Sequence, residues 1–255
     1  MEDTTKLLHF ALYAGAVMLS SGAETTRVED TMERIMSKSK ASIVECISVN
    51  TFLIASIVHE NETITLTRRI KNSSVNFEKI CLVNNISRAF VSGKITLDEA
   101  EVQLEKAETI PEFAPWLRVL AYSVACGAFT LTYGGTFLDA FISFWFGTML
   151  GGLLLISETK PVPYFFLHLA GGALAGVGCE LLVNIVPVPD MIIIGMITPL
   201  LPGRIMTNSI RDMLEGNFIC GATKLVEALL IGFAIAGGVN MGMIVGEALM
   251  GGGVL

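Results

Sequence analysis

The sequence predicts a polytopic α-helical membrane protein (about five transmembrane segments) with an N-terminal cytoplasmic α/β domain. Only 16% of its 255 residues are charged, whereas soluble domains carry about a quarter. Residues 1–115 hold 28 of the charged residues and residues 116–255 hold 13, while 22 of the 25 glycines lie in the second part. We therefore expect a soluble domain at 1–115 and a transmembrane helical domain at 116–255. These figures exclude a disordered chain and a disulfide-stabilised secreted mini-domain.

The first elements of the soluble domain are two expected helices. Residues 7–19 are apolar and end at a Ser-Ser-Gly sequence, which imitates a signal peptide. Because Glu2 and Asp3 precede this run, we favour a retained, buried helix. A second, amphipathic helix is expected to start near Thr26, since Thr26 and Glu29 have capping-box spacing.

Strands and two further helices are expected to complete this domain. Residues 42–58 are rich in Ile, Val and Thr and predict one or two strands, and residues 63–67 alternate strictly and predict another. Residues 75–91 predict a helix. Thr96 and Glu99 form a second capping box, which opens a helix before the prolines that precede the membrane half.

Five charge-free runs mark the membrane half. They cover residues 119–138, 140–157, 161–179, 191–203 and 228–246. About 20 apolar residues cross the hydrocarbon core as a helix, so four runs are long enough. The run at Met191 is a half-helix, a re-entrant segment or a span completed by its polar flanks. The expected segments lie near 117–134, 137–157, 163–185, 190–202 and 219–247.

The loop charges predict the orientation. If residues 1–115 lie in the cytoplasm, every Lys and Arg of the second half falls on or near the cytoplasmic side. These residues are Arg118, Lys160, Arg204, Arg211 and Lys224. This is the positive-inside pattern, so we expect a multi-pass protein of the cytoplasmic (inner) membrane, embedded in the lipid bilayer.

Four pairs of glycines are spaced four residues apart in the expected spans. They are Gly147–Gly151, Gly172–Gly176, Gly238–Gly242 and Gly242–Gly246. Small residues at this spacing clear one helix face, so that another backbone can approach closely. The pattern predicts a tightly packed bundle and favours an oligomer.

Polar residues in the membrane half are the candidates for function. Glu180 lies inside the third segment, with Asn184 one turn later. An ionisable group at membrane depth usually faces a bundle interior or a transport path. The alternative, a partnered group that fixes helix register, stays open for Glu180 and is favoured for Asp139 and Asp190 near the interface.

A second candidate region follows the short fourth segment. Two prolines and a glycine interrupt the helix there, and interrupted helices present free N–H groups and a positive dipole end to anions. Arg204 and Asn208 share a helical face, and an arginine can hold a carboxylate in a two-pronged fork. A cytoplasmic loop with positive-inside arginines is the alternative. The substrate and coupling candidates are Glu180, Asn184, Pro202, Gly203, Arg204, Asn208, Arg211 and Asp212.

Other kinds of site lack a pattern. The five cysteines include no CxxC pair, so free thiols are expected. Phosphate-binding loops and metal-ligand spacings are missing, so no metal and no cofactor are predicted. Basic residues are too few for a nucleic-acid partner.

Two stretches resemble a known family. The run Gly22–Ile35 (GAETTRVEDTMERI) is similar to the N-terminal signature of the threonine/serine exporter family. The Pro202–Gly203 break and the stretch 208–212 after it resemble the membrane half of that family. The signature residues are Gly22, Glu24, Thr25, Arg27, Glu29 and Asp30.

The resemblance implies secondary transport of small polar metabolites out of the cytoplasm. Fused members of the family carry a second, smaller membrane half, and split members place it on a separate polypeptide, one such pair being associated with succinate export. This chain ends after five expected spans. It therefore resembles the larger subunit of a split system, with a smaller membrane subunit as partner and threonine, serine or a dicarboxylate such as succinate as substrate.

Three functional hypotheses follow. The first is a carrier subunit, coupled to protons, with Glu180 as the coupling or gating carboxylate. The second is a membrane-anchored regulatory or assembly protein without transport of its own. The third, an intramembrane enzyme, ranks last because no nucleophile–base pair is visible. Convergence of Glu180, Asn184 and residues 202–208 on one polar cavity would favour the first, and dispersal would favour the second.

Overall fold

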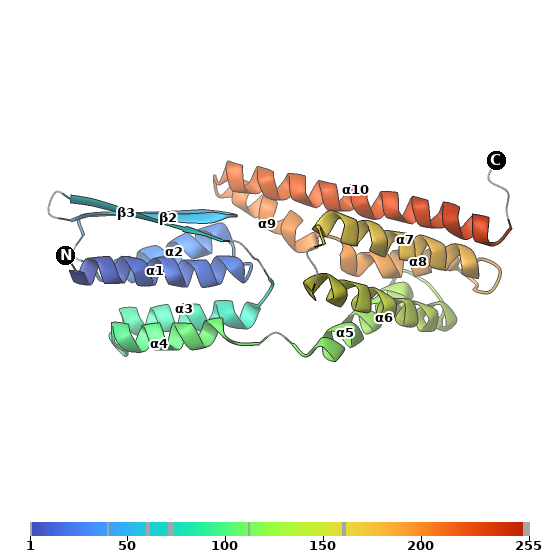
Figure 1. The fold of residues 1–255 in the computed structure, drawn as a ribbon, viewed down its shortest axis with the longest axis horizontal. Coiled ribbons are helices and arrows are strands. Elements are labelled where there is room, and N and C mark those ends of the chain that lie inside the picture. The colour runs from blue at the N-terminus through green and yellow to red at the C-terminus, as the bar shows by residue number, and fades with distance from the viewer. Residues whose placement is uncertain are drawn as a thin grey trace. The chain divides into compact units, whose positions relative to one another are not determined.

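The computed structural model describes residues 2–39, 41–59, 62–70, 74–111, 113–159 and 162–251, and these are mostly helical (Figure 1). The chain divides into two compact units. The first unit comprises residues 1–112 and 208–223, and the second comprises residues 113–207 and 224–255. Residues 208–223, which the sequence analysis placed in the membrane half, belong to the first unit.

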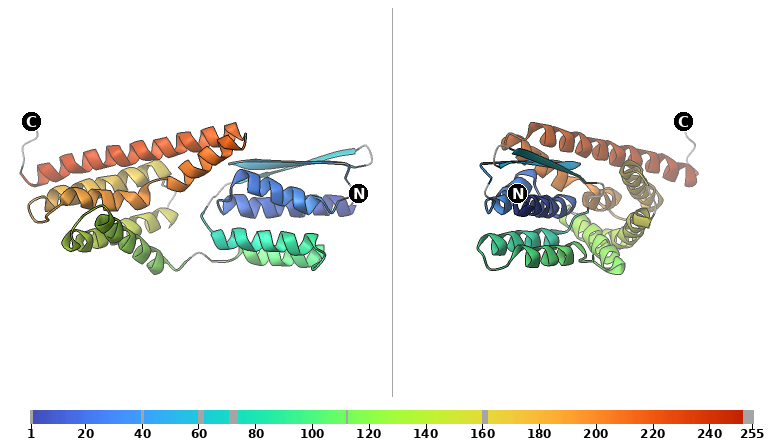
Figure 2. Two further views of the ribbon diagram at one scale, coloured as in Figure 1. Left: turned by 180° about the vertical axis from the view of Figure 1, so that it is seen from behind. Right: turned by 60° about the vertical axis from the view of Figure 1, so that its left-hand side comes forward.

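The first unit consists of an antiparallel sheet, four complete helices, the end of α9 and the start of α10. The elements are α1 (Glu2–Ser20), α2 (Thr25–Met36), β1 (Ile43–Val49), β2 (Phe52–His59), β3 (Glu62–Arg69), α3 (Phe77–Val91), α4 (Leu97–Glu108), α9 (Gly203–Leu214) and α10 (Phe218–Leu249). The strands follow the order β1-β2-β3, with Ile54 paired to Ile47 and to Thr67. Helices α1 and α2 lie between the sheet and the α3–α4 pair (Figures 1 and 2).

The core of the first unit lies between the sheet and α1 and α2. Leu53 and Ile57 of β2 are fully buried, as are Phe10 of α1 and Met32 of α2. Gly15 lets α1 approach α2, because a Cβ atom there would lie 2.5 Å from the sulfur of Met32. The helices are therefore held by apolar burial together with one close approach.

The structure confirms most of the elements expected here and corrects one. Residues 42–58 contain two strands, and the Thr96–Glu99 capping box is present. The capping box expected at Thr26 and Glu29 is wrong, since α2 begins at Thr25 with Glu24 as its N-cap residue. The Glu29 carboxylate instead accepts a hydrogen bond from the Ser48 N–H at 2.7 Å. A contact with a neighbouring strand has thus replaced the local cap.

The second unit is entirely helical in its described residues. It contains α5 (Pro115–Thr132), α6 (Phe137–Thr159), α7 (Tyr164–Leu182), α8 (Pro189–Ile197), the 3-10 turn η1 (Thr198–Leu200), the start of α9 and the rest of α10.

Several of these helices can cross a membrane. Among the described residues, 137–156, 164–182 and 218–249 are long and apolar enough. Residues 189–200 and α9 meet at a bend of 52° and raise the number to four if they form one broken span. Helix α5 lies where a span was expected, but it is not among the helices that are long and apolar enough to cross a membrane. The five-span count therefore stays a prediction. Lys160, used for the orientation, lies outside the described residues.

The glycine pairs lie at helix crossings inside the second unit. A Cβ atom on Gly176 would lie 2.2 Å from the Val239 carbonyl oxygen, and one on Gly238 would lie 2.1 Å from the Leu169 carbonyl oxygen. A Cβ atom on Gly147 would lie 2.8 Å from the Ser123 Cα atom of α5. The predicted close packing is confirmed between α7 and α10 and between α5 and α6. Oligomerisation stays a prediction.

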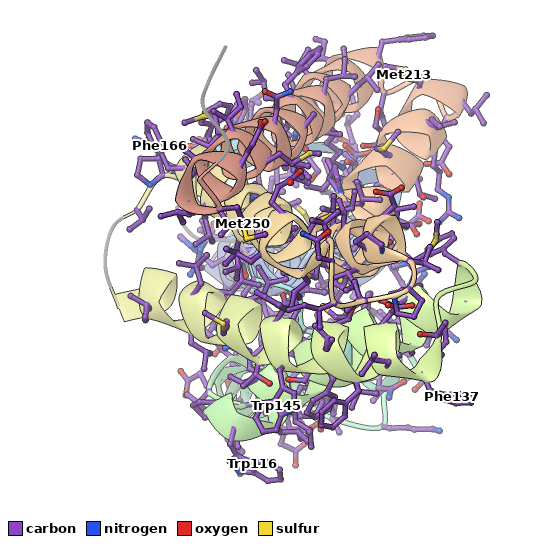
Figure 3. All side chains as sticks on the ribbon, turned by 90° about the vertical axis from the view of Figure 1, so that its right-hand side faces the viewer. Trp116, Phe137, Trp145, Phe166, Met213 and Met250 are labelled. Carbon is purple, nitrogen blue, oxygen red and sulfur yellow. The ribbon has the colours of Figure 1, made fainter. Side chains whose placement is uncertain are left out.

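Large apolar side chains project from the outside of α5 and α6. Trp116, Phe137 and Trp145 are 68%, 85% and 57% exposed and point away from the bundle (Figure 3). Such rings suit contact with lipid or its interface.

Candidate functional site

In the first unit, the signature run lies against the end of α9. The Glu24 carboxylate forms an ion pair with the Arg211 guanidinium. Arg27, one turn along α2, lies 3.8 Å from the other Glu24 oxygen. Because Glu24 is the N-cap residue of α2, the positive end of the helix also favours its charge. One carboxylate is therefore held by two arginines and a helix terminus.

The next two residues of the signature run, Thr25 and Thr26, bind the same segment. The Thr25 hydroxyl donates to Asp212 Oδ2 at 3.3 Å, and both residues are fully buried. The Thr26 hydroxyl donates to the Glu215 carboxylate and accepts a hydrogen bond from the Asn217 amide. We call Glu24, Thr25, Thr26, Arg211, Asp212 and Glu215 the signature contact. It joins residues 24–26 of the signature run to the last turn of α9 and to the residue that follows it.

Glu29 extends this network towards the sheet. Burial raises the pKa of its half-buried carboxyl, and the nearby carboxylates of Glu33, Asp30 and Asp212 raise it further, whereas the Ser48 N–H lowers it. The Ser48 carbonyl in turn accepts a hydrogen bond from the Cys220 thiol of α10 at 3.4 Å. Glu29 thus connects α2 to strand β1, and Ser48 connects β1 to the start of α10.

The last two signature residues, Gly22 and Asp30, lie outside the signature contact. Gly22 ends α1 with a φ of 83°, a conformation that favours glycine. Asp30 is exposed. The ion pairs of Glu24 with Arg211 and Arg27 give this region the chemistry of a fixed electrostatic junction.

A second polar cluster lies in the second unit, after the helix break. Arg204 lies within electrostatic range of the Glu227 carboxylate and of the Tyr164 phenol. The Tyr164 and His168 rings lie 4.2 Å apart, and His168 Nδ1 donates to the Tyr164 carbonyl at 2.9 Å. These four residues form the Arg204 cluster. They bring the first turn of α9, the start of α7 and α10 together.

The Pro202–Gly203 break positions Arg204. Leu201 ends the 3-10 turn in an extended conformation, and α9 starts at Gly203. The Pro202 carbonyl accepts the Met206 N–H at 2.9 Å. Arg204 therefore lies in the first turn of α9, with Asn208 one turn further along.

Glu180 and Asn184 lie elsewhere in the second unit. Glu180 is in the last turn of α7, half-buried against Gly246, and Asn184 is exposed in the turn that follows. Tyr164 marks the opposite end of α7, about 24 Å away at 1.5 Å per residue. Glu180 and Asn184 therefore do not converge with Arg204 on one cavity.

Sequence reasoning missed two members of the Arg204 cluster. His168 is a single histidine in an apolar run, which carries no spacing signal, and Tyr164 reads as an ordinary interfacial ring. Glu227 was visible as an acid near the end of a span, but only the fold brings it to Arg204. In the ranges that the structure describes, no group of three His, Cys, Asp or Glu residues could hold a metal ion.

Comparisons with known proteins place these features in context. A family model described as "Putative threonine/serine exporter" matches residues 9–246. The chain is 22% identical to the "Probable threonine/serine exporter" of Mycobacterium tuberculosis, covering 92% of this chain and 45% of that protein. It is 22% identical to the "Threonine/serine exporter" of Corynebacterium glutamicum, covering 95% and 52%. The chain thus spans about half the length of these two relatives.

A shorter relative matches over almost its whole length. The chain is 22% identical to the "Probable succinate transporter subunit YjjP" of Klebsiella aerogenes, covering 94% of this chain and 92% of that protein. No solved structure matches the chain.

Proposed function

The chain belongs to the threonine/serine exporter family, and from this premise we propose that it is a subunit of a secondary transporter. It exports a small polar metabolite across the cytoplasmic membrane, in exchange for or together with protons. The first unit lies in the cytoplasm, and a smaller membrane subunit completes the carrier. The name of the Klebsiella aerogenes relative, a transporter subunit, supports a two-part assembly.

The observation that carries this proposal is the Arg204 cluster at the helix break. A guanidinium in an apolar helical unit is costly, so it is typical of a substrate path. Arg204 offers two parallel donors to a carboxylate, and the neighbouring Glu227 offers an acceptor to an ammonium group. A zwitterionic amino acid such as threonine or serine carries both groups, so the pair fits it better than a dicarboxylate such as succinate.

The other nominated residues have separate roles. Glu180, with Asn184 after it, acts at the far end of α7 as a gating carboxylate. Arg211 and Asp212 anchor the end of α9 to the signature residues. Substrate contact therefore falls to Pro202, Gly203 and Arg204.

Flux measurements test the proposal. Vesicles containing the chain, with and without a candidate small membrane subunit, are loaded with labelled threonine, serine or succinate. We expect efflux of the amino acids that depends on the second subunit. Wild-type efflux from the double variant Glu180→Gln, Arg204→Ala would contradict the assigned residues.

A second candidate is a membrane-anchored regulatory or assembly protein. The separation of Glu180 from Arg204 along α7 favours it, since one shared cavity was the expectation for a carrier. It predicts no flux of any of the three metabolites with any partner, and no effect of changes at Arg204.

A further inference from the structure

Asp139 is a fully buried carboxylate in the second unit. It lies in the first turn of α6 and has no exposed surface. The Thr136 N–H and the Thr136 hydroxyl both donate to its Oδ2 atom at 2.7 Å. Among the described residues, Oδ1 is buried and has no hydrogen-bond partner. One oxygen is therefore satisfied by the helix cap, and the other is not.

Asp139 lies in a part of the sequence that has no Lys or Arg. Lys and Arg are missing from residues 119–159, 162–203 and 225–255 of the sequence, which include the α5–α6 and α7–α8 connections. The titratable groups on the ends of the helices packed against this part of α6 are Tyr133, Cys126, Asp190, Cys179 and Glu180. The charged ones among them are acids. A buried carboxylate without a cation is costly unless it binds a proton or a metal ion.

Two further buried hydroxyls lie in the α5–α6 interface, one helical turn along α6 from Asp139. Ser143, one turn further along α6, and Thr130 of α5 are fully buried, with their hydroxyl oxygens 2.8 Å apart. Thr130 also lies 2.9 Å from the Cys126 carbonyl. The Thr130 hydroxyl has one hydrogen to donate, so it can donate either to the Ser143 hydroxyl oxygen or to the Cys126 carbonyl.

The packing leaves little room for a larger occupant. A Cβ atom on Gly195 of α8 would lie 1.9 Å from the Thr130 hydroxyl oxygen, so α8 closes over this pair. A metal ion needs several oxygen ligands, whereas a proton needs only the one free oxygen of Asp139.

We propose that Asp139 is an exchangeable proton-binding site of the second unit, one helical turn from the buried hydroxyl pair of Ser143 and Thr130. This inference rests on the proposed transport function and assigns its coupling step to Asp139, since Glu180 is only half-buried. The proton binds Oδ1 while Oδ2 keeps both bonds from Thr136. Release restores the carboxylate, so no other reactant is consumed.

Two transport assays on the reconstituted wild-type carrier and its variants separate this inference from the proposed function. The first measures exchange of labelled threonine or serine at equal pH, and the second measures uphill transport driven by a pH gradient. We expect Asp139→Asn to exchange substrate at a rate within about twofold of the wild type. Its transport driven by the pH gradient should be at least tenfold slower. Asp190→Asn, which changes an exposed carboxylate at the start of α8, is the matched control and should keep both.

Each outcome has a distinct meaning. No flux in the wild type overturns the proposed function, and driven transport retained by Asp139→Asn overturns the role of Asp139. Driving by a sodium gradient instead of a pH gradient would overturn the proton as the ligand. If Asp139→Asn loses both activities, infrared difference spectra of the purified protein between two pH values decide. A protonated-carboxyl band that is present in the wild type and absent in Asp139→Asn supports the site, and an unchanged band overturns it.

Discussion

Glu24 and Arg211 are 187 positions apart in the chain and form an ion pair within the first unit. Glu24 caps the signature helix α2, and Arg211 lies in the last turn of α9. The same helix α9 carries Arg204 in its first turn. The signature residues are therefore connected, through one helix, to the residue that we propose to bind substrate.

Exchanging the two charges tests this pair. Glu24→Arg and Arg211→Glu should each lower the free energy of unfolding, because each places like charges together. The loss attributable to the pair is about 0–1 kcal/mol, since the side chains are 23% and 45% exposed and solvent screens them. The double exchange should recover part of the loss in a double-mutant cycle, measured by thermal unfolding of the full chain in detergent. Additive single losses would contradict the pairing, and Asp30→Arg serves as an exposed control from the same helix.

Glu29 should make stability depend on pH. Its pKa in the folded state is raised from 4.5, chiefly by burial. The folded state therefore binds more protons than the unfolded state above that value, and the free energy of unfolding falls as pH rises through this window. Glu29→Gln keeps an acceptor for the Ser48 N–H but does not ionise.

The measurement is the free energy of unfolding of both proteins between about pH 4 and about pH 7. The difference, Glu29→Gln minus wild type, should become more positive as pH rises and then level off. A difference that is flat or that falls would contradict the assignment. Glu29→Leu removes the acceptor and should be less stable than Glu29→Gln at every pH, by about 1 kcal/mol.

Local patterns were enough to predict much of the fold. Charge-free runs placed the long apolar helices, and the Thr96–Glu99 spacing placed the start of α4. The capping box predicted at Thr26 and Glu29 did not form because contacts with distant residues replaced it. The Thr26 hydroxyl and the Glu29 carboxylate are engaged by Glu215 and by the Ser48 N–H, so tertiary partners replaced the local cap.

The candidate site could be predicted only in part. The Pro202–Gly203 break and Arg204 were visible because proline and an isolated charge stand out in an apolar run. Contact between the signature and residues 211–215 was not, because nothing in a single sequence pairs positions so far apart. Asp139 was given a structural role on its position alone, since sequence cannot reveal that one of its oxygens is buried without a partner.

The glycine contacts between α7 and α10 allow a controlled test of packing. Gly176→Ala places a methyl group 2.2 Å from the Val239 carbonyl oxygen, so the two backbones must separate. We expect a loss of about 1–3 kcal/mol, as for other overpacked sites. Gly152→Ala is the matched control, since a Cβ atom there has no neighbour within 4 Å. It should be neutral or stabilising, because alanine favours a helix by about 0.5–1 kcal/mol over glycine. Equal effects of both changes on thermal unfolding would contradict the packing.

The Arg204 cluster should determine which substrates the carrier accepts. Arg204→Ala should reduce efflux of threonine, serine and succinate alike by at least tenfold, because all three carry a carboxylate. Arg204→Lys should be intermediate, since lysine keeps the charge but not the two-pronged fork. Glu227→Gln should reduce efflux of the two amino acids and spare succinate, because only the amino acids carry an ammonium group. Efflux from vesicles with matched protein content measures all three variants, with Lys224→Gln as the control on α10. Equal reduction of succinate and threonine efflux by Glu227→Gln would contradict binding of the ammonium group by Glu227. Its role would then be to hold Arg204 in place.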